Sequence, residues 1–429
     1  MGLRLNRPFR YQLLPTNFPI DNSTSGARMA DHRNNCQSFI ASKQTREQRL
    51  PNPTNALSRR QFGRLSIAGA IAGATAGTAL SFLHPTSASA APVPQPLWQP
   101  VQPRDRENSP SEKSPAELMT PKTQATIKKG LNFLLRNQVR SGRNRGAFGN
   151  GGYSGGVATA SLAGLAMMCA GHSPGQGKFG KAIDYCVEFV LKHVRETGYI
   201  SKSDAGNENM YGHGFSMLFL SQAYGMTQKA EIGKKLRKAV ELTCRTQNER
   251  GGWRYQPKKS DADLSITVCQ IMGLRGARDA GIDVPDEVRK KCIDYVKLSQ
   301  NKNGSFRYVQ RGGHSTFAMT AAGVTSLYSA GIYDGEGVEN GLKYLKKFKP
   351  TGTNRSSHYF YSNYYAVQAM WHAGGEYWNT WYPAIRDELI KSQSADGSWA
   401  FSEAELPFGA AMGCIILQMP LNYVPVFSP

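Results

Sequence analysis

A short pattern that recurs along the chain constrains its fold more than any other sequence feature. The pattern is Gln, three residues, Gly, one residue and an aromatic residue, and it occurs at residues 247–253, 300–306 and 393–399. Residues 138–148 form a looser copy with an insertion, and residues 198–199 keep only its Gly and aromatic residue. Repetition at a spacing of about fifty residues indicates an architecture built from repeated supersecondary units.

Each copy of the pattern separates two kinds of predicted helix. The helix before it is amphipathic: Ile127, Leu131 and Leu134 stand at i, i+4 and i+7, and residues 288–295 and 338–345 repeat this spacing. The helix after it, as at residues 157–170, is apolar almost all round. An amphipathic helix covers a core with one face, whereas a helix without a polar face must be buried on every side.

Six hairpins of an outer and an inner helix therefore follow one another along the chain. Their outer helices begin near Ile127, Ala182, Leu236, Glu287, Val338 and Tyr382. Neither end has the polar sequence of a capping repeat, which an open solenoid requires. The sequence predicts an all-α fold, an α/α toroid (an α6/α6 barrel) over residues 119–429.

The residues of the repeated pattern suit a tight turn between packed helices. Gly permits a positive φ and close approach of another backbone. The aromatic residue can lie as a wedge between neighbouring outer helices, and the Gln amide can donate to the backbone of the adjacent turn. The pattern is thus expected to hold the repeats together, and it carries no catalytic information.

The first part of the chain reads as an export signal. Arg59 and Arg60 precede an uncharged stretch at residues 65–83, and Ala-Ser-Ala follows at residues 88–90. A basic region, an apolar region and a small-residue cleavage site in this order describe a secretory signal. The arginine pair with Phe62 resembles a bacterial twin-arginine signal, which implies export to a periplasmic or extracytoplasmic space. The alternative is that the apolar stretch is retained as a membrane anchor.

Four regions follow from these features. Residues 1–57 are a polar leader expected to be disordered, with Met29 as an alternative start. Residues 58–90 are the twin-arginine signal peptide, residues 91–118 are a Pro-rich linker, and residues 119–429 are the toroid.

The three complete copies of the pattern resemble the Gln-Trp repeats of squalene and oxidosqualene cyclases and of protein prenyltransferase β subunits. The resemblance covers about residues 120–425 and implies a terpenoid-cyclase-like toroid. It is specific for the fold and poorly specific for the reaction. The toroid has one D-x-C sequence, Asp184-Tyr185-Cys186, but it lies within a predicted outer helix, and zinc needs a complete ligand set, so we expect no metal and no cofactor.

In squalene–hopene cyclases, a DxDD motif supplies the acid that protonates an alkene. Here the similar residues are Asp261-Ala-Asp263-Leu264, and the resemblance makes Asp263 the proton donor although Leu264 replaces the following acid. We predict His314 as its catalytic partner. The alternative role of Asp263 or Asp261 is to cap the following helix, since Asp is a favoured N-cap residue.

Aromatic and histidine side chains cluster where the inner helices begin. If these starting points share one rim, their side chains line a central cavity, since the mouths of barrels are common ligand sites. Aromatic faces there would stabilise a carbocation or bind an apolar chain. The predicted cavity-lining residues are Tyr153, Tyr211, His213, Asp261, His358, Tyr361, Tyr364, Tyr365 and His372. Ordinary packing of these rings is the alternative.

Three classes of function remain open. The chain is an enzyme or a degenerate relative acting on an isoprenoid or other apolar molecule, a non-catalytic binding or scaffold toroid, or a glycan-active (α/α) barrel enzyme. Of the net charge of +21, residues 1–90 hold +8 and the remainder +13, which allows peripheral contact with an anionic membrane surface. Its basic residues are scattered and no nucleic-acid-binding motif occurs, so nucleic acid is not an expected partner. The oligomeric state does not follow from the sequence.

The twin-arginine assignment is testable on the full chain expressed in a bacterial host. Replacing Arg59 and Arg60 together by Lys keeps the charge but removes the arginine pair that the export pathway reads. The precursor should then stay uncleaved inside the cell, as measured by fractionation and immunoblotting. Arg64→Lys is the matched control and should leave export intact. Unchanged export of the double variant would contradict the assignment.

Overall fold

The computed structural model describes residues 115–149, 155–202, 209–350, 358–399 and 406–428. All of them belong to one unit of the chain, Pro92–Pro429. The predicted leader and signal, including Arg59 and Arg60, and the predicted cavity residue Tyr153 lie outside the described residues. None of the described helices is long and apolar enough to cross a membrane.

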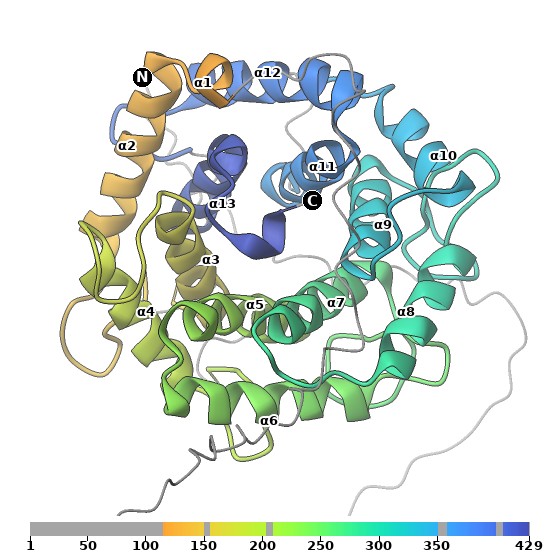
Figure 1. Ribbon diagram of the computed structural model, residues 1–429, viewed down its shortest axis with the longest axis horizontal. Helices are drawn as coiled ribbons and strands as arrows, with labels where there is room; N and C mark the ends of the chain where they lie inside the picture. The colour runs from red at the N-terminus through yellow and green to blue at the C-terminus, as the bar shows by residue number, and fades with distance from the viewer. Residues whose placement is uncertain (1–114, 150–154, 203–208, 351–357, 400–405, 429) are drawn as a thin grey trace, which may run out of the picture. The chain divides into compact units, whose positions relative to one another are not determined.

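The described residues form two concentric layers of helices, as predicted (Figure 1). The outer layer consists of α2 (Pro121–Asn137), α4 (Gly180–Lys192), α6 (Ala230–Thr246), α8 (Asp286–Leu298), α10 (Glu336–Leu345) and α12 (Gly375–Ser392). The inner layer consists of α3 (Val157–Met168), α5 (Met210–Thr227), α7 (Leu264–Asp279), α9 (Phe317–Ser329), α11 (Tyr359–Ala373) and α13 (Leu406–Gln418). A short helix, α1 (Pro115–Leu118), precedes them.

The two kinds of helix have the burial that the sequence predicts. Every residue of α3 is buried, and α13 is buried over almost its whole length. Each outer helix buries one stripe, such as Ile232, Leu236 and Val240 of α6. Packing begins before the predicted boundary at residue 118, because Leu118 is already buried.

The predicted ring closure is confirmed. The last inner helix, α13, packs against α3 and α2 at the start of the fold. Gln393 Nε2 donates to the carbonyl oxygen of Thr126 at 2.9 Å, and Arg136 donates to that of Asp396 at 2.6 Å. These bonds join residues more than 250 positions apart in the sequence.

The glutamine of the repeated pattern bonds to a different partner from the one predicted. It reaches the backbone of the next outer helix rather than that of the adjacent turn. Gln138, Gln247 and Gln300 donate to the carbonyl oxygens of Ala182 in α4, Val288 in α8 and Gly337 in α10, all at 2.8–2.9 Å. Gln247 and Gln300 also donate to the carbonyl of the glycine in their own turn. One amide therefore fixes both the turn and its neighbour.

The glycine of the pattern is required on two grounds. Gly146, Gly198, Gly251, Gly304 and Gly397 all have φ between +87° and +96°. A Cβ atom on any of them would also collide with a main-chain carbonyl of the next outer helix; for Gly304 this carbonyl belongs to Asn340. The incomplete copies around Gly146 and Gly198 thus make the same turn as the complete ones.

The aromatic residue is a wedge, as predicted. The Trp399 indole donates to the carbonyl oxygen of Leu389 in α12 at 2.8 Å. The same ring faces Gly130 of α2 and Gly413 of α13, where any side chain would meet it. It therefore lies between two neighbouring outer helices and over the inner one.

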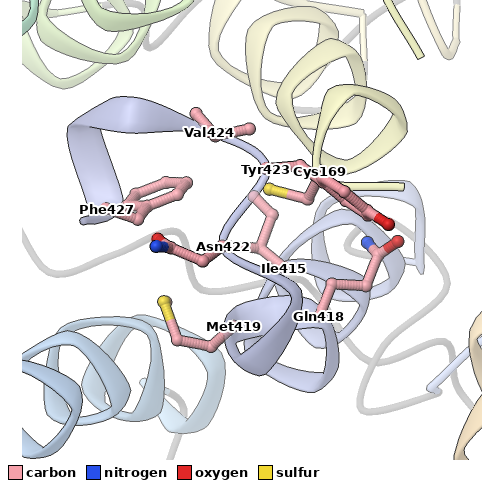
Figure 2. Close-up of a pocket in the computed structure, with 8 residues that line it drawn as sticks. All are labelled: Cys169, Ile415, Gln418, Met419, Asn422, Tyr423, Val424 and Phe427. Carbon is pink, nitrogen blue, oxygen red and sulfur yellow. The ribbon is translucent and has the colours of Figure 1, made fainter. Parts of the chain in front are cut away.

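The chain after α13 turns back into the middle of the inner layer through η4 (Met419–Leu421) and η5 (Pro425–Phe427) (Figure 1). The Phe427 ring packs 6.2 Å from that of Tyr364, and Arg275 donates to the carbonyl oxygen of Ser428 at 3.1 Å. Between this segment and α13 remains a pocket of about 10 Å³ beside Gln418 (Figure 2). This volume is enough for about one water molecule.

Gly304→Ala should lower the free energy of unfolding by roughly 2–4 kcal/mol, because it combines a strained positive φ with a collision against the Asn340 carbonyl. Gly281 is the matched control: its φ is +83°, and nothing lies within 4 Å of a Cβ atom built on it. Gly281→Ala should therefore cost only about 1 kcal/mol. Urea unfolding of both variants checks this, and equal losses would disprove the role of the carbonyl contact.

Candidate functional site

Asp263 is the N-cap residue of α7. Its Oδ1 accepts hydrogen bonds from the Ile266 amide at 2.9 Å and from Ser265 Oγ at 2.5 Å, and its side chain is fully buried. Asn209 and Thr316 cap α5 and α9 in the same way. The capping role of Asp263 is thus one instance of a feature that recurs in successive repeats.

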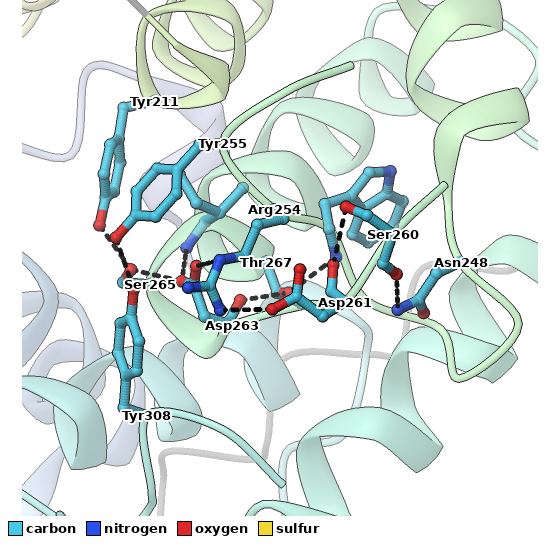
Figure 3. Close-up of polar contacts among 12 residues, drawn as sticks. Tyr211, Asn248, Arg254, Tyr255, Ser260, Asp261, Asp263, Ser265, Thr267 and Tyr308 are labelled. Atoms are coloured by element: carbon cyan, nitrogen blue, oxygen red, sulfur yellow. Dashed lines mark hydrogen bonds and ion pairs between the residues drawn. The ribbon is translucent and has the colours of Figure 1, made fainter. Parts of the chain in front are cut away.

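Asp263 differs from the other caps by an ion pair with Arg254 (Figure 3). Arg254 Nε lies 3.5 Å from Asp263 Oδ2, and another guanidinium nitrogen lies 3.1 Å from Asp261 Oδ2. The guanidinium carbon is 5.2 Å and 5.7 Å from the ring centroids of Tyr255 and Tyr308. Arg254 therefore joins the acidic pair to two aromatic faces.

The pKa of the Asp263 carboxyl is raised above its ordinary value, chiefly because burial penalises the charged form. Hydrogen bonds from Ser265 and the Ile266 amide, the charge of Arg254 and the Tyr308 hydroxyl act in the opposite direction. Burial thus favours the neutral carboxyl group, whereas these partners favour the charged carboxylate.

Four partly exposed tyrosines surround this acid and form what we call the tyrosine cluster: Tyr211, Tyr255, Tyr308 and Tyr361. The Tyr211 hydroxyl donates to Ser265 Oγ at 2.5 Å, and the Tyr361 hydroxyl donates to the Ser265 carbonyl at 3.1 Å. The hydroxyls of Tyr255 and Tyr308 are 2.5 Å apart. Tyr211 and Tyr361 also touch ring to edge, with centroids 6.1 Å apart.

Main-chain bonds between repeats position the two tyrosines that come from loops. The Tyr255 carbonyl accepts from the Met210 amide at the start of α5, at 3.0 Å. The Tyr308 carbonyl accepts from the Leu264 amide at the start of α7, at 2.9 Å. Each loop thus closes over the beginning of the preceding inner helix.

Below the cluster, side chains meet across the middle of the inner layer. The helices α5 and α11 lie on opposite sides of this layer (Figure 1), yet Phe215 of α5 packs 6.0 Å from Tyr364 of α11. Tyr365 Oη lies 3.0 Å from Cys269 Sγ of α7. Tyr364 and Tyr365 are fully buried, so these two predicted cavity residues pack in the interior.

The predicted histidines lie in several different places. His213 is not on the inner face: it is buried between the layers, with its Nε2 2.9 Å from Thr243 Oγ1 of α6. His372 packs against Tyr328 and Tyr333 near the end of α11, whereas the tyrosine cluster lies at the start of the inner helices. His358 is exposed at the start of α11, and its carbonyl accepts from the Ser362 amide.

His314, the predicted partner of Asp263, is exposed in the loop before α9. Among the described contacts, none joins it to Asp263. The structure instead brings Tyr211, Asp261, Asp263 and Tyr361 together, and adds Arg254 as the partner of the acid.

Sequence reasoning missed Arg254, Tyr255 and Tyr308. A usable signal exists, because Tyr255 and Tyr308 both follow the aromatic residue of the repeated pattern by two positions. In an α/α toroid, these positions lead from the turn towards the inner helix, so they reach the same end of the inner layer.

The chain matches no protein-family model and no curated protein. It is similar in structure to cellobiose 2-epimerase from Bacillus thermoamylovorans B4167, with 12% identity and a TM-score of 0.50 over 70% of this chain and 100% of that one. A novel α-amylase from Clostridium perfringens is 11% identical, with a TM-score of 0.49 over 68% and 97% of the two chains. The apo type II terpene cyclase MstE from Scytonema is 14% identical, with a TM-score of 0.47 over 72% and 100%.

Identities this low concern the fold alone. The likeness to the epimerase agrees with the α/α toroid seen in the described residues.

Acid should destabilise the protein through His213. Its Nδ1 accepts from the Ile200 amide, so Nε2 carries the proton and donates to Thr243, and burial lowers the pKa from 6.5 to about 3. The unfolded chain binds the proton more readily, so the free energy of unfolding should fall by up to roughly 5 kcal/mol as the pH drops through this interval.

Urea unfolding at a series of pH values measures this loss. His213→Gln should remove most of the pH dependence, whereas His314→Gln, at an exposed position, should retain it. A pH dependence that survives in His213→Gln would mean that another group causes it.

Proposed function

We propose that this chain is exported and binds an apolar or isoprenoid small molecule at the tyrosine cluster without converting it. One observation carries the proposal. Tyrosines from α5, from α11 and from the loops before α7 and α9 meet at the same end of the inner layer and remain partly exposed there. Tyrosine rings offer rigid apolar area at a low cost in conformational entropy.

The position of Asp263 supports binding over catalysis. Protonation of an alkene needs an acid whose proton reaches the substrate. The Asp263 side chain is fully buried, its Oδ1 accepts two hydrogen bonds, and its Oδ2 faces Arg254. Phe215 contacts Tyr364 and Cys269 contacts Tyr365 across the inner layer, so these four side chains pack against one another there.

An isoprenoid-converting enzyme is the second candidate, and one observation favours it. Burial raises the pKa of Asp263, as is common for catalytic acids. Ser265 and Tyr211 connect this carboxyl to the partly exposed cluster through two bonds of 2.5 Å. A proton could follow this connection if a substrate lay against Tyr211.

A glycan-active enzyme has less support. The fold is similar to that of an enzyme that acts on the sugar cellobiose. Cleavage of a glycan, however, needs two carboxylates that flank the glycosidic bond. Around the described tyrosine cluster the acids are Asp261 and Asp263, and Arg254 pairs with both.

Export remains part of the proposal and rests on Arg59, Arg60 and the apolar stretch that follows them. An exported protein that binds an apolar ligand would meet it at a membrane surface. Residues 91–429 contain 41 Lys+Arg and 28 Asp+Glu, and their net charge of +13 would favour contact with anionic headgroups.

Binding and turnover can be separated with one ligand, the isoprenoid alcohol farnesol. Calorimetric titration of the full chain should show binding, and Tyr361→Ala should weaken it by about tenfold through loss of aromatic contact area. Tyr185→Ala on α4, where Tyr185 contacts Arg145, is the matched control and should bind as the parent does.

Chemical analysis of the recovered ligand completes the test. We expect unchanged farnesol from both the parent and Asp263→Asn. A rearranged or dehydrated product that disappears in Asp263→Asn would establish the enzyme instead. Absence of binding by the parent would refute both candidates for this ligand class.

A further inference from the structure

Arg254 reaches from the interior of the protein to its surface. Its Nε lies 3.5 Å from Oδ2 of Asp263, whose side chain is fully buried. Its Nη1 lies 3.1 Å from Oδ2 of Asp261, whose side chain is 71% exposed. The arginine side chain itself is 27% exposed. One end of the guanidinium group is thus paired in the interior, and the other end meets a carboxylate that stands in solvent.

The carboxylate at this outer end is held weakly. Asp261 lies at ion-pair distance, and among the described residues no acceptor meets the N–H groups of Arg254 in hydrogen-bond geometry. Exposed ion pairs contribute little to stability, because water and salt screen them. Asp261 can therefore leave Arg254 and be hydrated at little cost. Asp263 cannot, because a buried charge that loses its partner is strongly destabilising.

Arg254 also adjoins the aromatic surface of the tyrosine cluster (Figure 3). Its guanidinium carbon is 5.2 Å from the ring centroid of Tyr255. The Tyr255 ring is 6.2 Å from that of Tyr211, which in turn is 6.1 Å from that of Tyr361. Three partly exposed rings therefore follow one another from the arginine. An extended apolar molecule can lie along them with one end at Arg254.

We propose, on the basis of the binding function above, that the ligand carries a carboxylate at one end of its apolar body, and that this carboxylate replaces Asp261 on Arg254. The Nη1 and Nη2 atoms can donate to both oxygens of one carboxylate, and such charge-assisted bonds are about twice as strong as those between neutral groups. The exchange keeps one negative charge at the outer end of the guanidinium, so its balance with Asp263 is unchanged.

Other end groups fit this arrangement less well. A phosphate monoester carries close to two negative charges at pH 7 and would bring the second towards the buried Asp263, which Arg254 already balances. A neutral hydroxyl group cannot replace the negative charge of Asp261 beside the arginine. An ammonium group would be repelled by the guanidinium.

The ligand test compares three molecules that share one carbon skeleton: farnesoic acid, farnesol and farnesyl phosphate. Calorimetric titration of the full chain at pH 7 should show the acid binding about tenfold more tightly than farnesol and about threefold more tightly than the phosphate. Equal or tighter binding of farnesol or of the phosphate would overturn the inference while leaving the binding function intact. If none of the three binds, the binding function itself fails.

Two variants with opposite expected effects locate the preference. Arg254→Gln should lower the affinity for farnesoic acid to that for farnesol, and its binding of farnesol reports that the tyrosine cluster is intact. Asp261→Asn removes the competing carboxylate at an exposed position, so it should strengthen binding of the acid about threefold and leave farnesol unchanged.

Asp294→Asn is the matched control for the second variant, because Asp294 is exposed on the outer helix α8 and the change in charge is the same. It should leave the affinities for the acid and for farnesol as in the parent. An unchanged affinity of Asp261→Asn for the acid would overturn the inference, and so would a preference for the acid that persists in Arg254→Gln.

Discussion

The structure depends on one contact that recurs from hairpin to hairpin, the approach of the pattern glycine to the backbone of the next outer helix. Where Gly251 meets α8 or Gly397 meets α2, no side chain separates the two main chains. The glutamine four residues earlier donates to the same helix and to its own turn. Because both groups lie on short, rigid turns, each hairpin is placed at a set angle to the next, and successive placements return the chain to its start.

The same turns also build the candidate site. Two residues beyond the aromatic wedge, the chain crosses to the preceding inner helix and covers its first amide with a carbonyl, as at Tyr255 and Tyr308. The repeated turn that holds the hairpins together therefore also positions these two side chains at one end of the inner layer. Asp263 gains its partners there because the N-cap of α7 lies beneath this crossing, where Arg254 and Ser265 both reach it.

Much of the architecture could be predicted, because helix periodicity and the repeated turn are local in sequence. The outer and inner helices and the wedge of Trp399 followed from patterns within one repeat, and the closed ring followed from the number of repeats and the lack of capping sequence. Contacts between repeats could not be derived in this way. The residues beside His213 in the sequence are apolar on all sides, so they do not indicate whether its side chain faces the centre or α6. Its bond to Thr243 shows that it faces α6. The pairing of Arg254 with Asp263 likewise depends on how a loop folds back.

The bond from Gln393 to Thr126 has a consequence for how the chain acquires its structure. An open solenoid can grow from any nucleus, because each added repeat needs only one neighbour. In a ring, the last hairpin must contact the first, although the whole domain separates them in sequence. Until this contact forms, one apolar side of the first hairpin and one of the last remain exposed to solvent. The closing step carries the largest loop entropy and buries surface on both flanks together. Assembly of such a ring is therefore completed by its most distant contact, and partial rings are left with exposed ends that favour association with other chains.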